Sequence, residues 1–188
     1  MNEIIEMKGQ DIVESHKKPI KSDLPKYWEK EYINHCLSMI PNHSHKMLMM
    51  FLWMCGVRIT EAINLTKGDI DLINSTMTVK WLKSRKYNHR VVPIHPNLKL
   101  ILEVYTASMK DLDKVFPMSR QRAWQLTQKY FQGHPHQFRH SFAVNWLRNK
   151  GDIIILHRIL GHSKVQTTME YLKIVPIDQG EELNKIKF

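Results

Sequence analysis

An apolar stretch at residues 47–57 constrains the fold more than any other feature of the chain. The spacing predicts a helix over residues 45–55 that is apolar on nearly every face, with Ser44 as its amino-terminal cap and Gly56 as its stop signal. Such a helix is stable in water only when other elements cover it on all sides. The stretch is also shorter than the roughly 18 to 20 residues that a membrane span needs. We therefore expect it at the centre of a globular core.

The hydrophobic period changes from helical to alternating in the middle of the chain. Residues 76–81 and 90–94 are rich in β-branched and aromatic side chains, which predicts an antiparallel hairpin with the polar residues 82–89 as its long turn. Residues 69–71 are expected to add a short strand. The predicted fold class is mainly α with a small antiparallel β-sheet (α+β). Helices are predicted at residues 26–39, 60–65, 97–106, 119–131, 137–150, 152–160 and 164–172, with a short terminal helix in 176–188.

The charge of the chain favours a polyanionic partner. Its 188 residues carry 28 Lys and Arg against 18 Asp and Glu, which gives a formal net charge of +10. Such an excess is typical of proteins that bind nucleic acid or, less often, an acidic membrane surface. The hydrophobic fraction of 43% excludes wholesale disorder. Cys36 and Cys55 form no CxxC pair, and the amino terminus shows no apolar segment of secretory length, so we expect a soluble cytoplasmic domain.

Five short motifs carry residue types that suit chemistry on a phosphate. Each motif alone has an ordinary structural explanation, such as an Arg paired with a Glu at a helix start or a half-buried Tyr on an amphipathic helix. Their order and spacing along one chain are far more specific. In chain order they are G-x-R-x-x-E with Arg58 and Glu61, a hairpin with Lys83 and Lys86, H-x-x-R with His136 and Arg139, L-G-H with His162, and Tyr171 nine residues after His162.

This ordered set resembles the tyrosine recombinase, or phage integrase, family, over residues 24–174. The resemblance implies the fold of that family's catalytic domain, which agrees with the predicted elements. It also implies a site-specific recombinase that cleaves and rejoins double-stranded DNA through a 3′-phosphotyrosyl intermediate, by integration, excision, inversion or resolution. No metal and no other cofactor is expected. Such an enzyme is associated with the nucleoid when it acts.

The chemistry of phosphodiester cleavage explains the residue types in the motifs. Arg58 and Arg139 are expected to hold the scissile phosphate, because a guanidinium matches phosphate oxygens bidentately and stays charged. Tyr171 is the expected nucleophile, although an ordinary tyrosine with a pKa near 10 needs assistance. By resemblance, His136 is the candidate general base, and His162 is expected to hydrogen-bond a phosphate oxygen.

A lysine of the hairpin is expected to protonate the leaving 5′-oxygen, as implied by the resemblance. Two lysines compete for this role, and the loop differs from the commoner G-K-G form of the family. By resemblance, Lys83 is favoured over Lys86, because it sits at the end of the first predicted strand, where the lysine of the family usually lies. Glu61 is expected to be a supporting residue that orients its neighbours through hydrogen bonds.

The histidines around the H-x-x-R motif do not predict a metal site. His134, His136 and His140 lack the HExxH spacing, and no cysteine lies near them. Two other functions remain open. A type IB topoisomerase would use similar chemistry to relax supercoils, and a non-catalytic relative would bind DNA as a regulator.

Basic residues outside the motifs are candidates for DNA contacts. Residues 1–23 form a polar basic tail in which Lys17 and Lys18 could serve as a DNA-contacting arm. Arg120 and Arg122 open a predicted helix and could hold phosphates there. Trp124, on the same helix, is expected to pack inward.

The length of the chain predicts a single-domain member of the family, or else a natural or engineered catalytic fragment. Most members carry an amino-terminal DNA-binding domain, whereas only 57 residues precede Arg58, and those from Leu24 belong to the catalytic domain. DNA binding is therefore expected to be weak and strongly dependent on salt. Residues 175–188 are expected to dock on a neighbouring protomer, so that a free monomer assembles into a tetramer on DNA.

Overall fold

The computed structural model describes residues 24–83, 86–175 and 184 of the chain. The predicted tail at residues 1–23, with Lys17 and Lys18, lies outside the described residues, as does nearly all of the carboxy-terminal segment at 175–188. Within the described part, none of the helices is long and apolar enough to cross a membrane.

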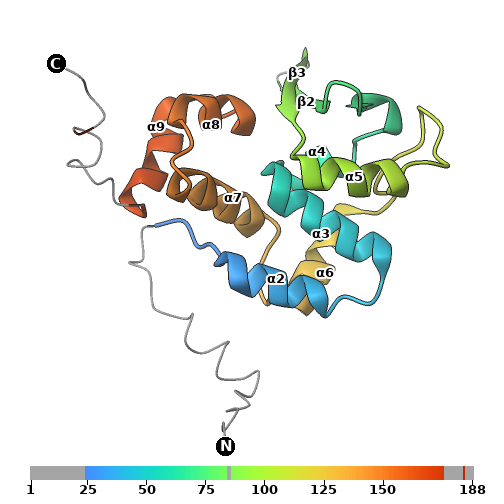
Figure 1. Ribbon diagram of the computed structural model, residues 1–188, viewed down its shortest axis with the longest axis horizontal. Coiled ribbons are helices and arrows are strands. Elements are labelled where there is room, and N and C mark those ends of the chain that lie inside the picture. Colours follow the sequence, from blue (N-terminus) through green and yellow to red (C-terminus); the bar gives the residue numbers. More distant parts are fainter. Residues whose placement is uncertain (1–23, 84–85, 176–183, 185–188) are drawn as a thin grey trace, which may run out of the picture.

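The architecture is mainly helical with one three-stranded antiparallel sheet, which confirms the predicted fold class. Figure 1 shows the sheet on one side of α3 and the carboxy-terminal helices α7, α8 and α9 grouped together. The elements are α2 (Lys30–Ser38), α3 (His43–Cys55), α4 (Ile59–Ala62), η1 (Lys67–Asp69), β1 (Ile70–Asp71), β2 (Thr76–Lys83), β3 (Lys86–Pro93), α5 (Pro96–Tyr105), α6 (Arg120–Phe131), α7 (His136–Arg148), α8 (Ile153–Leu160), α9 (Val165–Met169) and η2 (Glu170–Lys173).

Helix α3 is the buried centre that its apolar sequence predicts. It contacts α2, α4 and α7, and most of its side chains belong to the main hydrophobic core. Gly56 ends it at φ 62°, and a Cβ there would lie 2.4 Å from Cδ1 of Phe142. The predicted cap was wrong. Asn42 caps the helix, its side chain accepting a hydrogen bond from the His45 amide at 2.9 Å, because the helix begins at His43 and Ser44 already lies inside it.

The β2–β3 hairpin is longer than predicted. Its strands pair from Thr76↔Pro93 to Lys83↔Lys86, so residues 82–89, expected as a turn, are almost all strand. Backbone pairing accounts for the difference. An antiparallel ladder forms irrespective of side-chain polarity. The side chains of Met77, Val79 and Val92 are buried, whereas most of residues 82–89 are polar in sequence.

A second, smaller hydrophobic cluster holds the carboxy-terminal elements together. It comprises Ala143, Val144, Leu156, Leu160, Tyr171 and Val175. Helix α7 contributes to both clusters, because Phe138 belongs to the main core. The predicted helix at residues 164–172 is in fact α9 followed by the 3₁₀ helix η2, which turns Tyr171 towards α7.

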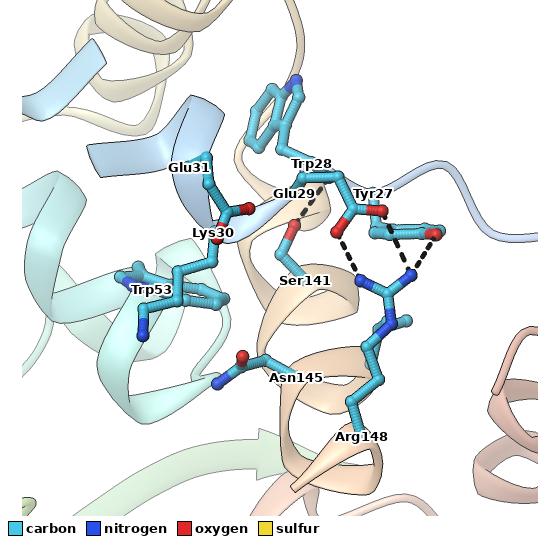
Figure 2. A pocket seen from close by; sticks show the side chains of 10 residues that line it. Tyr27, Trp28, Glu29, Lys30, Glu31, Trp53, Ser141, Asn145 and Arg148 are labelled. Atoms are coloured by element: carbon cyan, nitrogen blue, oxygen red, sulfur yellow. Dashed lines mark hydrogen bonds and ion pairs between the residues drawn. The ribbon is translucent and has the colours of Figure 1, made fainter. Parts of the chain in front are cut away.

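The chain that precedes α2 is fixed to α7 by polar contacts. Figure 2 shows Arg148 of α7 bonded to the carboxylate of Glu29 and to the hydroxyl of Tyr27, with Trp53 across a small cavity. The Trp28 amide also donates to the Ser141 hydroxyl at 2.8 Å. None of the residues of the five motifs lines this cavity.

Candidate active site

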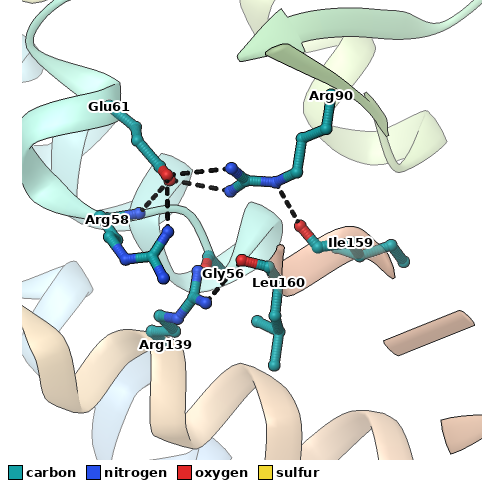
Figure 3. Close-up of polar contacts among 7 residues, drawn as sticks. All are labelled: Gly56, Arg58, Glu61, Arg90, Arg139, Ile159 and Leu160. Carbon is teal, nitrogen blue, oxygen red and sulfur yellow. Dashed lines mark hydrogen bonds and ion pairs between the residues drawn. The ribbon is translucent and has the colours of Figure 1, made fainter. Parts of the chain in front are cut away.

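Four of the five motifs meet where the loop after α3, strand β3, and helices α7 and α8 come together. Figure 3 shows how Arg58 and Arg139 approach this point from α4 and α7. The fifth motif, the hairpin lysines, sits at the far end of β2 and β3, where Lys83 pairs with Lys86 in the ladder. Their side chains lie outside the described part of the structure.

Glu61 is the buried anchor of this site. Only 5% of the residue is exposed, and its carboxylate accepts hydrogen bonds from the backbone amide of Arg58 at 2.8 Å and from Nη1 of Arg58 at 2.9 Å. Burial alone would raise the pKa of Glu61, but hydrogen bonds from Arg90 and Arg58 outweigh it and lower the pKa below its ordinary value. Glu61 is thus a carboxylate that holds Arg58 in place through two hydrogen bonds.

Arg90 is the second arginine that binds Glu61, and it is not among the site residues predicted from the sequence. Both of its terminal nitrogens donate to the Glu61 carboxylate, at 2.9 and 2.8 Å, and its Nε donates to the backbone carbonyl of Ile159 at 2.7 Å. One side chain therefore ties β3 to α4 and α8. The sequence contains one indication of this role. Arg90 is two residues before the buried Val92 in the same strand, so the two side chains lie on the same face of the sheet. A cation on that face needs a buried acid.

Arg139 is fully buried beside Arg58. Its Nη1 donates to the Gly56 carbonyl at 2.9 Å and its Nη2 to the Leu160 carbonyl at 2.6 Å, while its Nε has no hydrogen-bond partner among the residues that the structure describes. Burial, with the charge of Arg58, lowers the pKa of Arg139 to about 9. The guanidinium therefore keeps its positive charge at neutral pH and has one unpartnered N–H. By contrast, 36% of the Arg58 side chain is exposed.

Tyr171 lies inside the protein rather than on its surface. The residue is 2% exposed, and its hydroxyl oxygen lies 2.8 Å from Nδ1 of His140. Its ring is roughly parallel to that of His162, with 6.5 Å between the ring centroids. Burial raises the pKa of Tyr171 to about 12, although the charges of Arg139 and Arg58 oppose the rise. At neutral pH the hydroxyl is protonated.

His162 is oriented by a threonine that the motifs did not point to. Its Nδ1 lies 2.8 Å from the hydroxyl of Thr168, which is itself fully buried and also 3.2 Å from Nδ1 of His157. Burial, with the charges of Arg139 and Arg58, lowers the pKa of His162 to about 3. The imidazole is thus neutral. Gly161 before it adopts φ 62°, which ends α8 and leaves room for the stem of Arg90.

His136 and His140 share one face of α7, four residues apart. Their ring centroids are 4.6 Å apart, nearly edge to face. His136 keeps part of its side chain in solvent, yet the loss of water around its ring, with the charges of Arg139 and Arg58, lowers its pKa to about 4. Among the described residues, no hydrogen bond joins His136 to Tyr171, and His140 takes that place.

The remaining candidates lie on α6. Arg120 and Arg122 are exposed at its start, where the Ser119 hydroxyl accepts from the Arg122 amide at 3.1 Å. Trp124 was expected to pack inward, and this was wrong, because it is 48% exposed. Ala123 and Thr127 lie on the buried face of the helix instead, and Trp124 is rotated by about 100° from Ala123 around the helix axis. No metal-binding group of acidic, His or Cys side chains occurs among the described residues.

Comparisons with known proteins identify the family of the chain. Residues 28–176, most of the chain, match the model of the phage integrase family. The chain belongs to the phage integrase family. It is 30% identical over 183 residues to tyrosine recombinase XerA of Pyrococcus horikoshii, covering 89% of this chain and 64% of that protein. The chain thus spans less than two thirds of this relative's length.

Solved phage integrase and recombinase structures share the fold. The catalytic domain of the bacteriophage HP1 integrase superposes with a TM-score of 0.68 at 22% identity, covering 86% of this chain and 94% of that one. A XerH site-specific recombinase bound to a palindromic difH substrate, in a post-cleavage complex, gives a TM-score of 0.61 at 21% identity, covering 87% and 53% of the two chains. At these identities the likeness concerns the fold.

Proposed function

We propose that this phage integrase family member is a site-specific DNA recombinase whose nucleophile is Tyr171. One observation carries the proposal most directly. Burial raises the pKa of the Tyr171 hydroxyl, and this hydroxyl lies close enough to Arg58 and Arg139 for their positive charges to oppose that rise. A tyrosine so placed is suited to attack a phosphate that the same two cations hold, because they stabilise the negative charge of the pentacoordinate transition state.

The reaction is a transesterification. The oxygen of Tyr171 forms a bond to phosphorus, and the bond from phosphorus to the 5′-oxygen breaks, which leaves a 3′-phosphotyrosyl link and a free 5′-hydroxyl. A neutral histidine of α7 takes the tyrosine proton, and His136 is the histidine predicted for this role from the sequence. Lys83, or else Lys86, gives a proton to the leaving oxygen. Because the phosphotyrosyl link conserves the energy of the phosphodiester bond, attack by a 5′-hydroxyl rejoins the strand without consuming ATP.

Two features of the site support this assignment. Glu61 and Arg90 fix Arg58 before any substrate arrives, and preorganised charge is worth most in catalysis. His162 is neutral and held by Thr168, which suits a hydrogen-bond donor to a phosphate oxygen.

Duplex DNA is the proposed partner, in keeping with the net charge of +10 and with the complex of a similar fold, the Tn1549 transposon integrase, with circular intermediate DNA. We infer that Arg120 and Arg122 hold phosphates of the duplex, and that free monomers assemble into a tetramer on DNA. Native mass spectrometry with and without a target duplex tests the assembly. A tetramer in the absence of DNA would contradict it.

Trapping the covalent intermediate tests the function. Nicked duplex oligonucleotides tiled across the DNA that flanks the gene lose a short strand when cleaved, so the phosphotyrosyl adduct accumulates. We expect adducts with the wild type and with Tyr130→Phe, a matched control for the loss of a tyrosine hydroxyl. None should form with Tyr171→Phe. If the wild type forms no adduct on any duplex of the set, or if Tyr171→Phe still does, the proposal fails.

A further inference from the structure

The structure leaves one histidine of the active site without a part in the reaction. His140 belongs to none of the five motifs, yet its Nδ1 is 2.8 Å from the oxygen of Tyr171. Among the described residues no other hydrogen-bond partner contacts that hydroxyl. The inference below rests on the proposed function and concerns the first step of cleavage.

We propose that His140 orients the hydroxyl of Tyr171 for attack and receives its proton. The proposal moves the role of general base from His136 to the next histidine along the same face of α7. His140 touches the reacting oxygen, whereas His136 contacts the ring of His140.

The direction of the hydrogen bond follows from protonation. Burial, with the charges of His136 and Arg139, lowers the pKa of His140 to about 3, so the ring is neutral at neutral pH. The Tyr171 hydroxyl holds its proton, and a buried O–H needs an acceptor. Nδ1 of His140 is the acceptor at hand, so the tyrosine donates and Nε2 of His140 carries the ring proton.

This arrangement prepares the oxygen for attack. The O–H bond points at His140, which leaves the lone pairs of the Tyr171 oxygen free to face the phosphate. As the oxygen–phosphorus bond forms, the proton on that oxygen becomes strongly acidic, so even a weakly basic imidazole takes it. Nδ1 of His140 gains the proton that the oxygen loses, and the imidazolium is stabilised by the anionic phosphate nearby. No prior ionisation of the tyrosine is needed.

Substitution of His140 by Asn and by Leu separates these roles, because Asn offers an acceptor near the position of Nδ1 but cannot take up a proton. We expect both variants to bind the target duplex within about twofold of the wild type. Their single-turnover rate of adduct formation is expected to fall by about 100-fold or more, the usual contribution of a general base. His35→Asn, at an exposed position on α2, is the control and should react normally.

Two outcomes would overturn the proposal. If His140→Asn cleaves within about threefold of the wild type, an acceptor suffices and no base acts there. If His140→Leu cleaves as fast as the wild type or faster, the contact only restrains the tyrosine. Failure of the proposed function looks different, because the wild type itself then forms no adduct.

A measurement without DNA guards against misfolded variants. Two-bond ¹H–¹⁵N correlation spectra report which ring nitrogen of a histidine carries its proton. We expect His140 of the wild type to be neutral with an unprotonated, hydrogen-bonded Nδ1, and we expect this nitrogen signal to shift in Tyr171→Phe. A proton on Nδ1 of His140 at neutral pH would contradict the proposal even if the variants were inactive.

Discussion

Two halves of the active site accommodate their buried polar groups in opposite ways. Around Glu61 the groups are charged, and its carboxylate pairs with the guanidiniums of Arg58 and Arg90. At Tyr171 the titrating groups are neutral, since the hydroxyl keeps its proton and the neighbouring imidazoles of His140 and His162 are uncharged at neutral pH. The charged half is therefore complete before DNA arrives, whereas the neutral half changes protonation only during the reaction.

Removing the central acid should have the largest effect on this comparison. In Glu61→Gln the guanidiniums of Arg58 and Arg90 lose their counter-charge, and breaking a buried ion pair costs about 3–5 kcal/mol of unfolding free energy. Denaturant unfolding measures it. The control is Glu170→Gln, which removes an exposed pair with Lys173 and should cost about 1 kcal/mol or less. Equal losses of unfolding free energy in the two variants would show that the buried ion pairs of Glu61 stabilise the fold no more than an exposed ion pair does.

The second largest effect on stability is expected at Gly161, in the turn between the two halves. Gly161 adopts a left-handed conformation, and a Cβ there would lie 3.0 Å from Cδ of Arg90. Gly161→Ala is expected to cost about 1–2 kcal/mol of unfolding free energy, from the strained backbone. Thermal melts should show the loss. Gly68→Ala is the matched control, because Gly68 has no positive φ, and its variant should melt at the higher temperature of the two.

The neutral half should make the fold sensitive to mild acid. The pKa values of His140 and His162 are about 3 when folded against an ordinary value of 6.5. Between these values the unfolded chain binds protons that the folded chain does not. Stability is therefore full above about pH 6.5 and falls as the pH is lowered, by about 1 kcal/mol per pH unit or less for each histidine.

Glu61 contributes to acid sensitivity in the same direction at lower pH, because its folded pKa is lowered and its stabilisation is lost as the pH falls through that value. Unfolding curves between pH 7 and pH 4 measure the slope. The double variant His140→Gln, His162→Gln should flatten the slope above about pH 5, where Glu61 does not titrate. An unchanged slope would show that these two histidines titrate normally in the folded protein.

The smallest expected effect lies outside both halves, on α6. Arg120→Ala and Arg122→Ala each remove one proposed phosphate contact, so each should lower the slope of log affinity against log salt by about 1. Electrophoretic mobility shifts over a salt series measure it. Lys110→Ala, at another exposed cation, is the control. A slope that changes no more for the arginines than for Lys110 would exclude α6 from the DNA interface.

The sequence predicted the elements better than the contacts between them. The buried helix α3, the hairpin and the helical remainder follow from local hydrophobic period, which acts over a few residues. Helix boundaries and caps depend on single hydrogen bonds, and there Ser44 was mistaken for Asn42. The hairpin was predicted too short because backbone pairing continues where the side chains are polar.

In the active site, too, the sequence predicted the residues better than the contacts between them. The motifs named the residues whose types the chemistry demands, and the structure brings Arg58, Arg139, His162 and Tyr171 together. The partners of these residues come from distant parts of the chain, so the local sequence does not show which residues they contact. His140 is 31 residues from Tyr171 and Arg90 is 29 from Glu61.

The burial of Tyr171 has a consequence for how such a protein can lose its activity over evolutionary time. The ring belongs to the cluster that joins α7, α8 and η2, so replacing it with Ala would open a cavity costing about 3–5 kcal/mol. Loss of the hydroxyl alone keeps the ring in place. A lineage that abandons catalysis but keeps the fold is therefore expected to retain an aromatic residue at this position, with Phe the most accessible replacement.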